Sequence, residues 1–155
     1  MLSGTHEKIL IIDENAEFSG DLSLRLSGMG IASDTTDDAE KAMESLKKGH
    51  YGIVIMDPVD HIPRIRTLMN LIPGIVVLAI SKDEAVGASI QAVWAGAVDL
   101  IPHRAEHLQL ETAVRRAIDR RILLKQTLTL KRRITMLYVL CGMCLLIGFG
   151  LSLRF

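Results

Sequence analysis

The sequence has little cysteine, and both residues, Cys141 and Cys144, fall in an apolar stretch near the C-terminus. This scarcity excludes a disulfide framework and a Cys/His zinc site, and it fits a reducing compartment. No Gly-x-Gly-x-x-Gly motif or P-loop occurs, which argues against a bound nucleotide cofactor. The first six residues are mostly polar and contain no signal-peptide core.

The sequence also lacks an excess of charge, because 18 Lys and Arg balance 18 Asp and Glu. Overall charge therefore gives no indication of nucleic acid binding, and we expect no nucleic acid partner. The distribution is uneven, since acidic residues concentrate before residue 61. Basic residues gather in one later stretch: Arg115, Arg116, Arg120, Arg121, Lys125, Lys131, Arg132 and Arg133.

Short apolar runs alternate with amphipathic segments through most of the chain. The run 51–56 is apolar at all positions but Gly52, as in a strand that is buried on both faces. Similar runs occur at 8–12, 75–80 and 97–101, with a weaker one at 31–33 that suits an edge strand. Five β-α repeats predict a doubly wound parallel sheet.

Several helix starts are marked by capping residues. Asn15 is expected to cap the first helix. Asp37, with Glu40 three residues later, predicts the start of the second helix, by analogy with a capping box. Asp83 predicts the start of the fourth helix, in which Trp94 is expected to be a packing residue.

Carboxylates follow two of the apolar runs. Asp13 and Glu14 follow the first run, and Asp57 follows the run 51–56. If the sheet order is 2-1-3-4-5, which periodicity does not reveal, these strand ends are neighbours. Adjacent carboxylates repel one another unless a cation such as Mg²⁺ lies between them, and one carboxylate can instead attack a phosphoryl group. The alternative is three exposed acids at helix starts, where acids are common.

Residues 7 to about 121 resemble the receiver domain of two-component response regulators. The resemblance rests on Ile9–Glu14, Ile53–Pro58, Ser81 and Ala95–Asp99. It implies a flavodoxin-like (βα)5 fold with the sheet order 2-1-3-4-5.

The resemblance also implies a phosphorylation site. Asp57 is the implied phosphoacceptor, and Ser81 supplies the hydroxyl that bonds the phosphoryl group. Asp13, Glu14, Asp57 and the backbone carbonyl of Val59 are the implied Mg²⁺ ligands. The implied partners are a histidine kinase or phosphotransfer protein upstream and a protein target downstream. We expect no independent enzymatic activity.

Three features depart from the family pattern. His103, followed by Arg104, stands where the family has a lysine, and a histidine is cationic only part of the time near neutral pH. Leu100 replaces the aromatic switch residue, and the segment between Asp57 and Ser81 is shorter than usual. His103 is therefore the candidate for the catalytic role of the lysine, and Arg104 could substitute only if its side chain turned inward. The alternative is a pseudo-receiver, a protein-interaction module that works without phosphorylation.

Residues 134–153 form a run of 20 residues without a charge. As a helix, this run spans about 30 Å, the thickness of a bilayer core. Three basic residues, 131–133, precede it, so the positive-inside rule predicts a cytoplasmic N-terminal domain. The expected organisation is a receiver-like domain (1–121), a basic helical stalk (122–133) and a single-pass helix in a bacterial inner membrane. The alternative is a packing helix or a buried hairpin.

Leu124 and Leu128 continue a 4-3 spacing of apolar residues in the stalk. A solvated stalk is the alternative, but for these two residues the spacing favours a parallel two-helix seam, and hence a homodimer, because the receiver domain should already have ended. The chain leaves no room for a DNA-binding or enzymatic output domain. We therefore expect its output to be a protein contact.

Overall fold

The computed structural model describes residues 8–58, 62–81 and 86–152, apart from the side chains of residues 39, 86, 88, 89 and 144–152. The chain divides into two compact units, Met1–Arg121 and Ile122–Phe155. The first unit contains the sheet and its helices, whereas the described residues of the second unit, 122–152, are helical.

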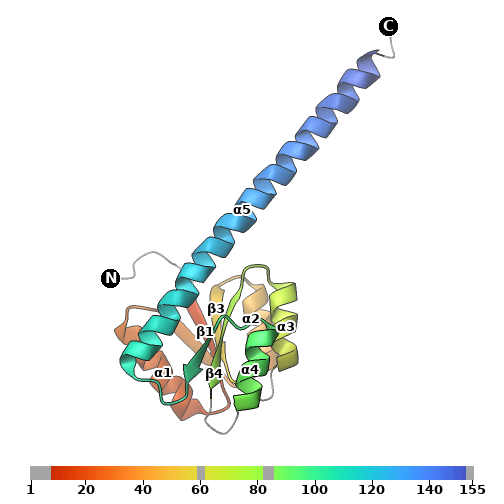
Figure 1. Cartoon of the computed structure of the whole chain (residues 1–155). Coiled ribbons are helices and arrows are strands. Elements are labelled where there is room, and N and C mark those ends of the chain that lie inside the picture. Colours follow the sequence, from red (N-terminus) through yellow and green to blue (C-terminus); the bar gives the residue numbers. More distant parts are fainter. Residues whose placement is uncertain (1–7, 59–61, 82–85, 153–155) are drawn as a thin grey trace. The chain divides into compact units, whose positions relative to one another are not determined.

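Strands and helices alternate along the first unit (Figure 1). The strands are β1 (Lys8–Ile12), β2 (Ser33–Thr36), β3 (Tyr51–Met56), β4 (Val76–Ser81) and β5 (Asp99–Pro102). The helices are α1 (Ala16–Gly28), α2 (Ala39–Lys47), α3 (Ile62–Leu71), α4 (Val86–Ala95) and α5 (His107–Ser152). The five predicted β-α repeats are thereby confirmed.

The five strands form one parallel sheet in the order β2-β1-β3-β4-β5. This confirms the flavodoxin-like order 2-1-3-4-5. Strand β2 lies at the edge, as predicted, but it begins at Ser33 rather than Ile31, because Ser33 is the residue that pairs with Ile9. The four residues of this edge strand are all polar. An edge strand can carry polar residues because only part of its surface is buried. Apolar periodicity therefore marked it poorly.

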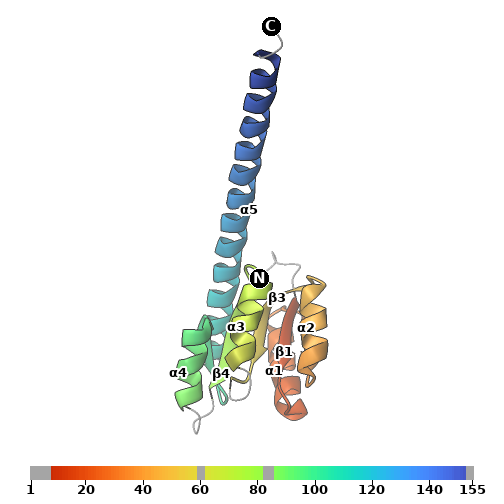
Figure 2. The same ribbon diagram turned by 90° about the vertical axis from the view of Figure 1, so that its right-hand side faces the viewer.

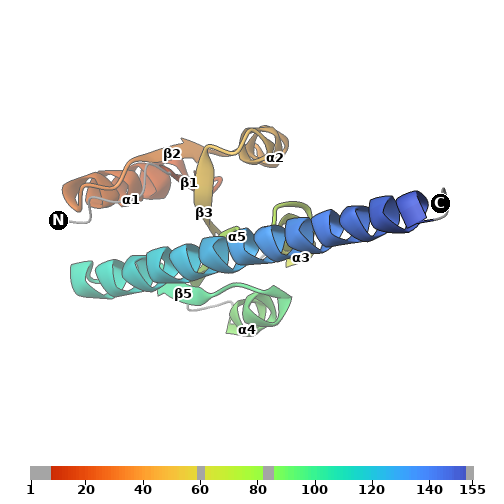
Figure 3. The same ribbon diagram turned by 90° about the horizontal axis from the view of Figure 1, so that it is seen from above.

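Helices cover both faces of the sheet, which explains why the central strands lack polar alternation. Helices α2, α3 and α4 lie on one face (Figure 2), and α1 and the first turns of α5 lie on the other (Figure 3). The first face holds a buried cluster made of Leu10, Val54, Val77, Leu46, Ile65, Leu68 and Ala92 among others. On the second face the buried helix residues include Leu22, Leu26, Leu110 and Val114.

Polar side chains cap α1 and α2. The side chain of Asn15 accepts hydrogen bonds from the two backbone N–H groups that follow Ala16, each at 3.1 Å, which confirms the predicted cap. Helix α2 is capped by Asp38, so the prediction of Asp37 was wrong by one residue. The Thr36 hydroxyl accepts a hydrogen bond from the Asp38 N–H at 3.2 Å and sets this turn. The predicted cap Asp83 lies outside the described residues.

In the part of the chain that the structure describes, no helix is long and apolar enough to cross a membrane. The transmembrane segment predicted at 134–153 is thus not supported by the structure. That segment is covered only in part, because the side chains from residue 144 onward lie outside the described residues.

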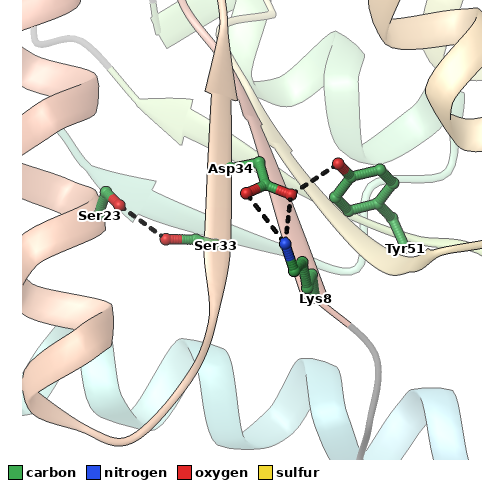
Figure 4. A network of polar contacts seen from close by, with 5 residues as sticks. All are labelled: Lys8, Ser23, Ser33, Asp34 and Tyr51. Atoms are coloured by element: carbon green, nitrogen blue, oxygen red, sulfur yellow. Dashed lines mark hydrogen bonds and ion pairs between the residues drawn. The ribbon is translucent and has the colours of Figure 1, made fainter.

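A polar network joins the amino ends of β1, β2 and β3 (Figure 4). Lys8 Nζ donates to Asp34 Oδ2 at 3.1 Å, and the Tyr51 hydroxyl donates to the same oxygen at 2.7 Å. Nearby, the hydroxyl oxygens of Ser23 and Ser33 lie 2.9 Å apart. The hydrogen bond from Tyr51, assisted by Lys8, holds the pKa of Asp34 below its usual range. The network thus fixes the edge strand at the amino end of the sheet, away from Asp13 and Asp57.

Replacing Asp34 with Asn is expected to lower the free energy of unfolding at pH 7 by about 0.5 kcal/mol, a small value because the ion pair is exposed and screened. The lowered pKa means that Asp34 stabilises the fold above about pH 4. This contribution is lost as the pH falls through the pKa of the folded state. Urea unfolding between pH 7 and about pH 3 should show the difference from wild type shrinking. Asp37→Asn, in the neighbouring turn, is the matched control, and a pH-independent difference for Asp34→Asn contradicts this account.

Candidate functional site

Four strands bring polar residues to the carboxyl edge of the sheet. Asp13 follows β1, Asp57 follows β3, Ser81 ends β4 and His103 follows β5. Because β1, β3, β4 and β5 are consecutive in the sheet, these four residues stand in order along one edge. This is the edge at which open parallel sheets place their ligands.

The pairing of the strands sets the neighbours along this edge. Ile12 pairs with Met56, so Asp13 and Asp57 are the next residues of adjacent strands. At the other end of the edge, the His103 N–H donates to the Ser81 carbonyl at 2.9 Å, a hydrogen bond that belongs to the pairing of Ser81 with Pro102. The backbone thus brings together the predicted residues Asp13, Asp57, Ser81 and His103.

Asp13 is the one buried carboxylate among the described residues, with 6% of its surface exposed. Its Oδ1 accepts a hydrogen bond from the Asn15 N–H at 2.7 Å. Its Oδ2 is also buried, and within the described part of the protein it has no hydrogen-bond partner. A buried carboxylate oxygen without a partner is costly, and a bound cation is one group that can offset this cost.

The other predicted metal ligands differ from Asp13 in their exposure. Asp57 is half-buried, Glu14 is exposed, and Val59 lies outside the described residues. Over the described ranges, no three His, Cys, Asp or Glu side chains form a group that could hold a metal ion. Mg²⁺, however, takes only one or two protein carboxylates and keeps several waters. Asp13 and Asp57 carry hard oxygen atoms that could ligate such an ion, and the unpartnered Oδ2 of Asp13 is compatible with one.

The His103 ring stacks on Phe18, with the ring centroids 4.2 Å apart and the planes inclined by 13°. Close by, Arg25 Nη2 donates to the Ala105 carbonyl at 2.6 Å. The loop between β5 and α5 is therefore joined to α1 at two points. Arg104 is exposed. Sequence reasoning missed Phe18 as part of this edge, although its place in the first turn after Asp13 and Asn15 was a usable signal.

Leu100 of β5 and Trp94 of α4 differ in their burial. Leu100 is partly buried against the core cluster on the face of α2, α3 and α4. Trp94 is 77% exposed, so its prediction as a packing residue was wrong. The buried side of α4 contains the small residues Ala92 and Ala95, which leaves the large indole on the outer side of the helix.

Comparison with protein-family models finds no match. Comparison with curated proteins finds no match either. Solved structures do match. The receiver domain of NtrX from Brucella abortus superposes with a TM-score of 0.68 and 21% sequence identity, over 72% of this chain and 98% of that one.

Two further solved structures give the same result. A response regulator receiver domain protein from Clostridium thermocellum has a TM-score of 0.70 and 20% identity, over 76% of this chain and 98% of that one. The beryllofluoride-activated NtrC4 receiver domain dimer has a TM-score of 0.65 and 19% identity, over 73% and 98%. The chain therefore has the flavodoxin-like fold of response regulator receiver domains.

Proposed function

We propose that this chain is a response-regulator receiver domain that accepts a phosphoryl group on Asp57 in a phosphorelay. The observation that carries the proposal is the pairing of Ile12 with Met56, which makes Asp57 the neighbour of the buried Asp13. The similarity to receiver domains of known structure adds support for this use of the fold.

The proposed chemistry is the transfer of a phosphoryl group from a phosphohistidine of a histidine kinase or phosphotransfer protein. An Asp57 carboxylate oxygen attacks phosphorus, the P–N bond breaks, and the imidazole of the donor leaves as an acyl phosphate forms. Asp13 and Asp57 would hold Mg²⁺, with Glu14 and the Val59 carbonyl as further candidate ligands, and the ion would supply charge neutralisation. The Ser81 hydroxyl and the His103 ring are proposed to donate hydrogen bonds to the phosphoryl oxygens.

The second candidate is a pseudo-receiver that binds a partner without phosphorylation. Two observations favour it: His103 replaces a lysine, which is charged at neutral pH, and Leu100 replaces the aromatic switch residue. Both candidates require a surface for a downstream protein target. The outer side of α4 is the proposed surface, because Trp94, Ile90 and Val93 are 77%, 48% and 45% exposed. A second copy of the chain is a further candidate partner, since the similar NtrC4 receiver domain is a dimer.

We also propose that the chain is anchored in a bacterial inner membrane, with its N-terminal domain in the cytoplasm. The support comes from the sequence alone. Residues 134–153 carry no charge, and no Asp or Glu follows Asp119. The basic stretch 120–133 is therefore free of acidic residues and suits the anionic surface of the cytoplasmic leaflet.

The phosphoacceptor role predicts that the full chain, incubated with Mg²⁺ and acetyl phosphate, gains the mass of one phosphoryl group. Intact-protein mass spectrometry measures the gain. Asp57→Asn should abolish it, since the amide lacks the nucleophilic carboxylate, whereas the control Asp60→Asn should keep it. A wild-type chain that gains no mass excludes the phosphoacceptor role and favours the pseudo-receiver. A gain that survives Asp57→Asn places the acceptor elsewhere.

The membrane proposal predicts that the full chain, expressed in a bacterium, stays in the membrane pellet after an alkaline wash. Met143→Arg combined with Leu146→Arg should move the protein to the supernatant, because charges in the middle of a span cost about 3 kcal/mol each. Leu128→Arg, outside the uncharged run, is the matched control and should stay in the pellet. Release of the wild-type chain by the wash contradicts membrane insertion.

A further inference from the structure

The stacked pair Phe18 and His103 joins two segments that are far apart in the sequence. Phe18 belongs to the first turn of α1, which follows β1, whereas His103 follows β5. Both side chains are half-buried. Their near-parallel rings, 4.2 Å apart, make the contact one of ring faces rather than edges. The pair therefore joins α1 to the loop after β5 at the carboxyl edge of the sheet.

The backbone on each side of this pair is held in place. The Phe18 N–H donates to the Asn15 side chain at 3.1 Å, and the His103 N–H donates to the Ser81 carbonyl at 2.9 Å. The hydrogen bond from Arg25 to the Ala105 carbonyl holds the loop two residues further on. Hydrogen bonds thus hold the backbone at Phe18 and at His103. The stacking contact between the two side chains then sets the orientation of the His103 ring.

The chemistry of histidine makes this orientation consequential. A lysine side chain reaches an anion with a flexible four-carbon stem, whereas an imidazole is short, rigid and must be aimed. A phenyl face suits this purpose, because it packs against the neutral ring and attracts the ring when it is cationic. Holding a donor in the productive orientation before the reaction is a general source of rate.

We propose that Phe18 is a positioning residue, which stacks on His103 and aims its ring N–H at a phosphoryl group on Asp57. This inference rests on the proposed function and adds to it a residue outside the implied Asp13, Glu14, Asp57 and Ser81 set. Phe18 then serves as the support that lets a histidine stand where a lysine is expected.

A double-mutant cycle on the full chain tests the proposal. The variants are Phe18→Leu, His103→Ala and their combination, with Phe18→Tyr as the matched variant that keeps an aromatic face. The measurement is the rate of phosphoryl incorporation from acetyl phosphate in the presence of Mg²⁺. We expect each single variant to be about fivefold slower than wild type, and the double variant to be no slower than His103→Ala. Phe18→Tyr should remain within about twofold of wild type.

A spectroscopic measurement separates positioning from general packing. In the NMR spectrum, the ring C–H signals of His103 should be shifted upfield by the facing phenyl ring. Phe18→Leu should remove this shift and Phe18→Tyr should keep it, while both variants retain the amide spectrum of a folded domain. A His103 signal that does not respond to Phe18→Leu overturns the proposal.

The kinetic outcomes are equally decisive. If the losses of Phe18→Leu and His103→Ala multiply in the double variant, Phe18 acts independently of His103 and the inference is wrong. The inference is also wrong if Phe18→Tyr is as slow as Phe18→Leu. A wild-type chain that takes up no phosphoryl group overturns the proposed function and this inference together, whereas multiplying losses in an active chain overturn the inference alone.

Discussion

The parallel pairing of β1 with β3 is the constraint on which the site depends. It ends with Ile12 opposite Met56, so the chain places two carboxylates, Asp13 and Asp57, at adjacent strand ends. Like charges in such positions repel, and the buried Oδ2 of Asp13 has no hydrogen-bond partner among the described residues. This cost is confined to one edge of the sheet, where a bound cation would offset it. The polar network around Asp34, by contrast, is fully paired and lies at the opposite edge.

Helix α1 connects the acidic part of the edge to the loop that follows β5. It starts directly after Asp13, at the Asn15 cap, and it contacts the loop through Phe18 and Arg25. The loop carries a histidine in place of the lysine typical of receiver domains. The ring of His103 stacks on Phe18, and this contact gives the ring a defined place.

Much of the fold could be predicted because the central strands are covered on both faces. Uninterrupted apolar runs such as 51–56 mark such strands clearly, and the carboxylates that follow them mark the edge of the sheet. The edge strand was misplaced by two residues, since its polar residues carry little periodic signal. Trp94 was misplaced because small residues, Ala92 and Ala95, occupy the buried side of its helix. The contact of Phe18 with His103 was missed, since periodicity assigns residues to faces but does not pair residues from distant segments.

The measurement that tests the central claim most directly is a Mg²⁺ titration of the full chain, followed by calorimetry or by the amide NMR signals of the carboxyl edge. The account predicts one saturable site, which is lost in Asp13→Asn and in Asp57→Asn and is kept in the control Asp37→Asn. Asp13→Asn should also stabilise the metal-free protein, because the amide oxygen can still accept from the Asn15 N–H while the buried negative charge is removed. A wild-type chain that binds no Mg²⁺, or whose binding is unchanged by Asp13→Asn, contradicts the claim that these two strand ends form one site.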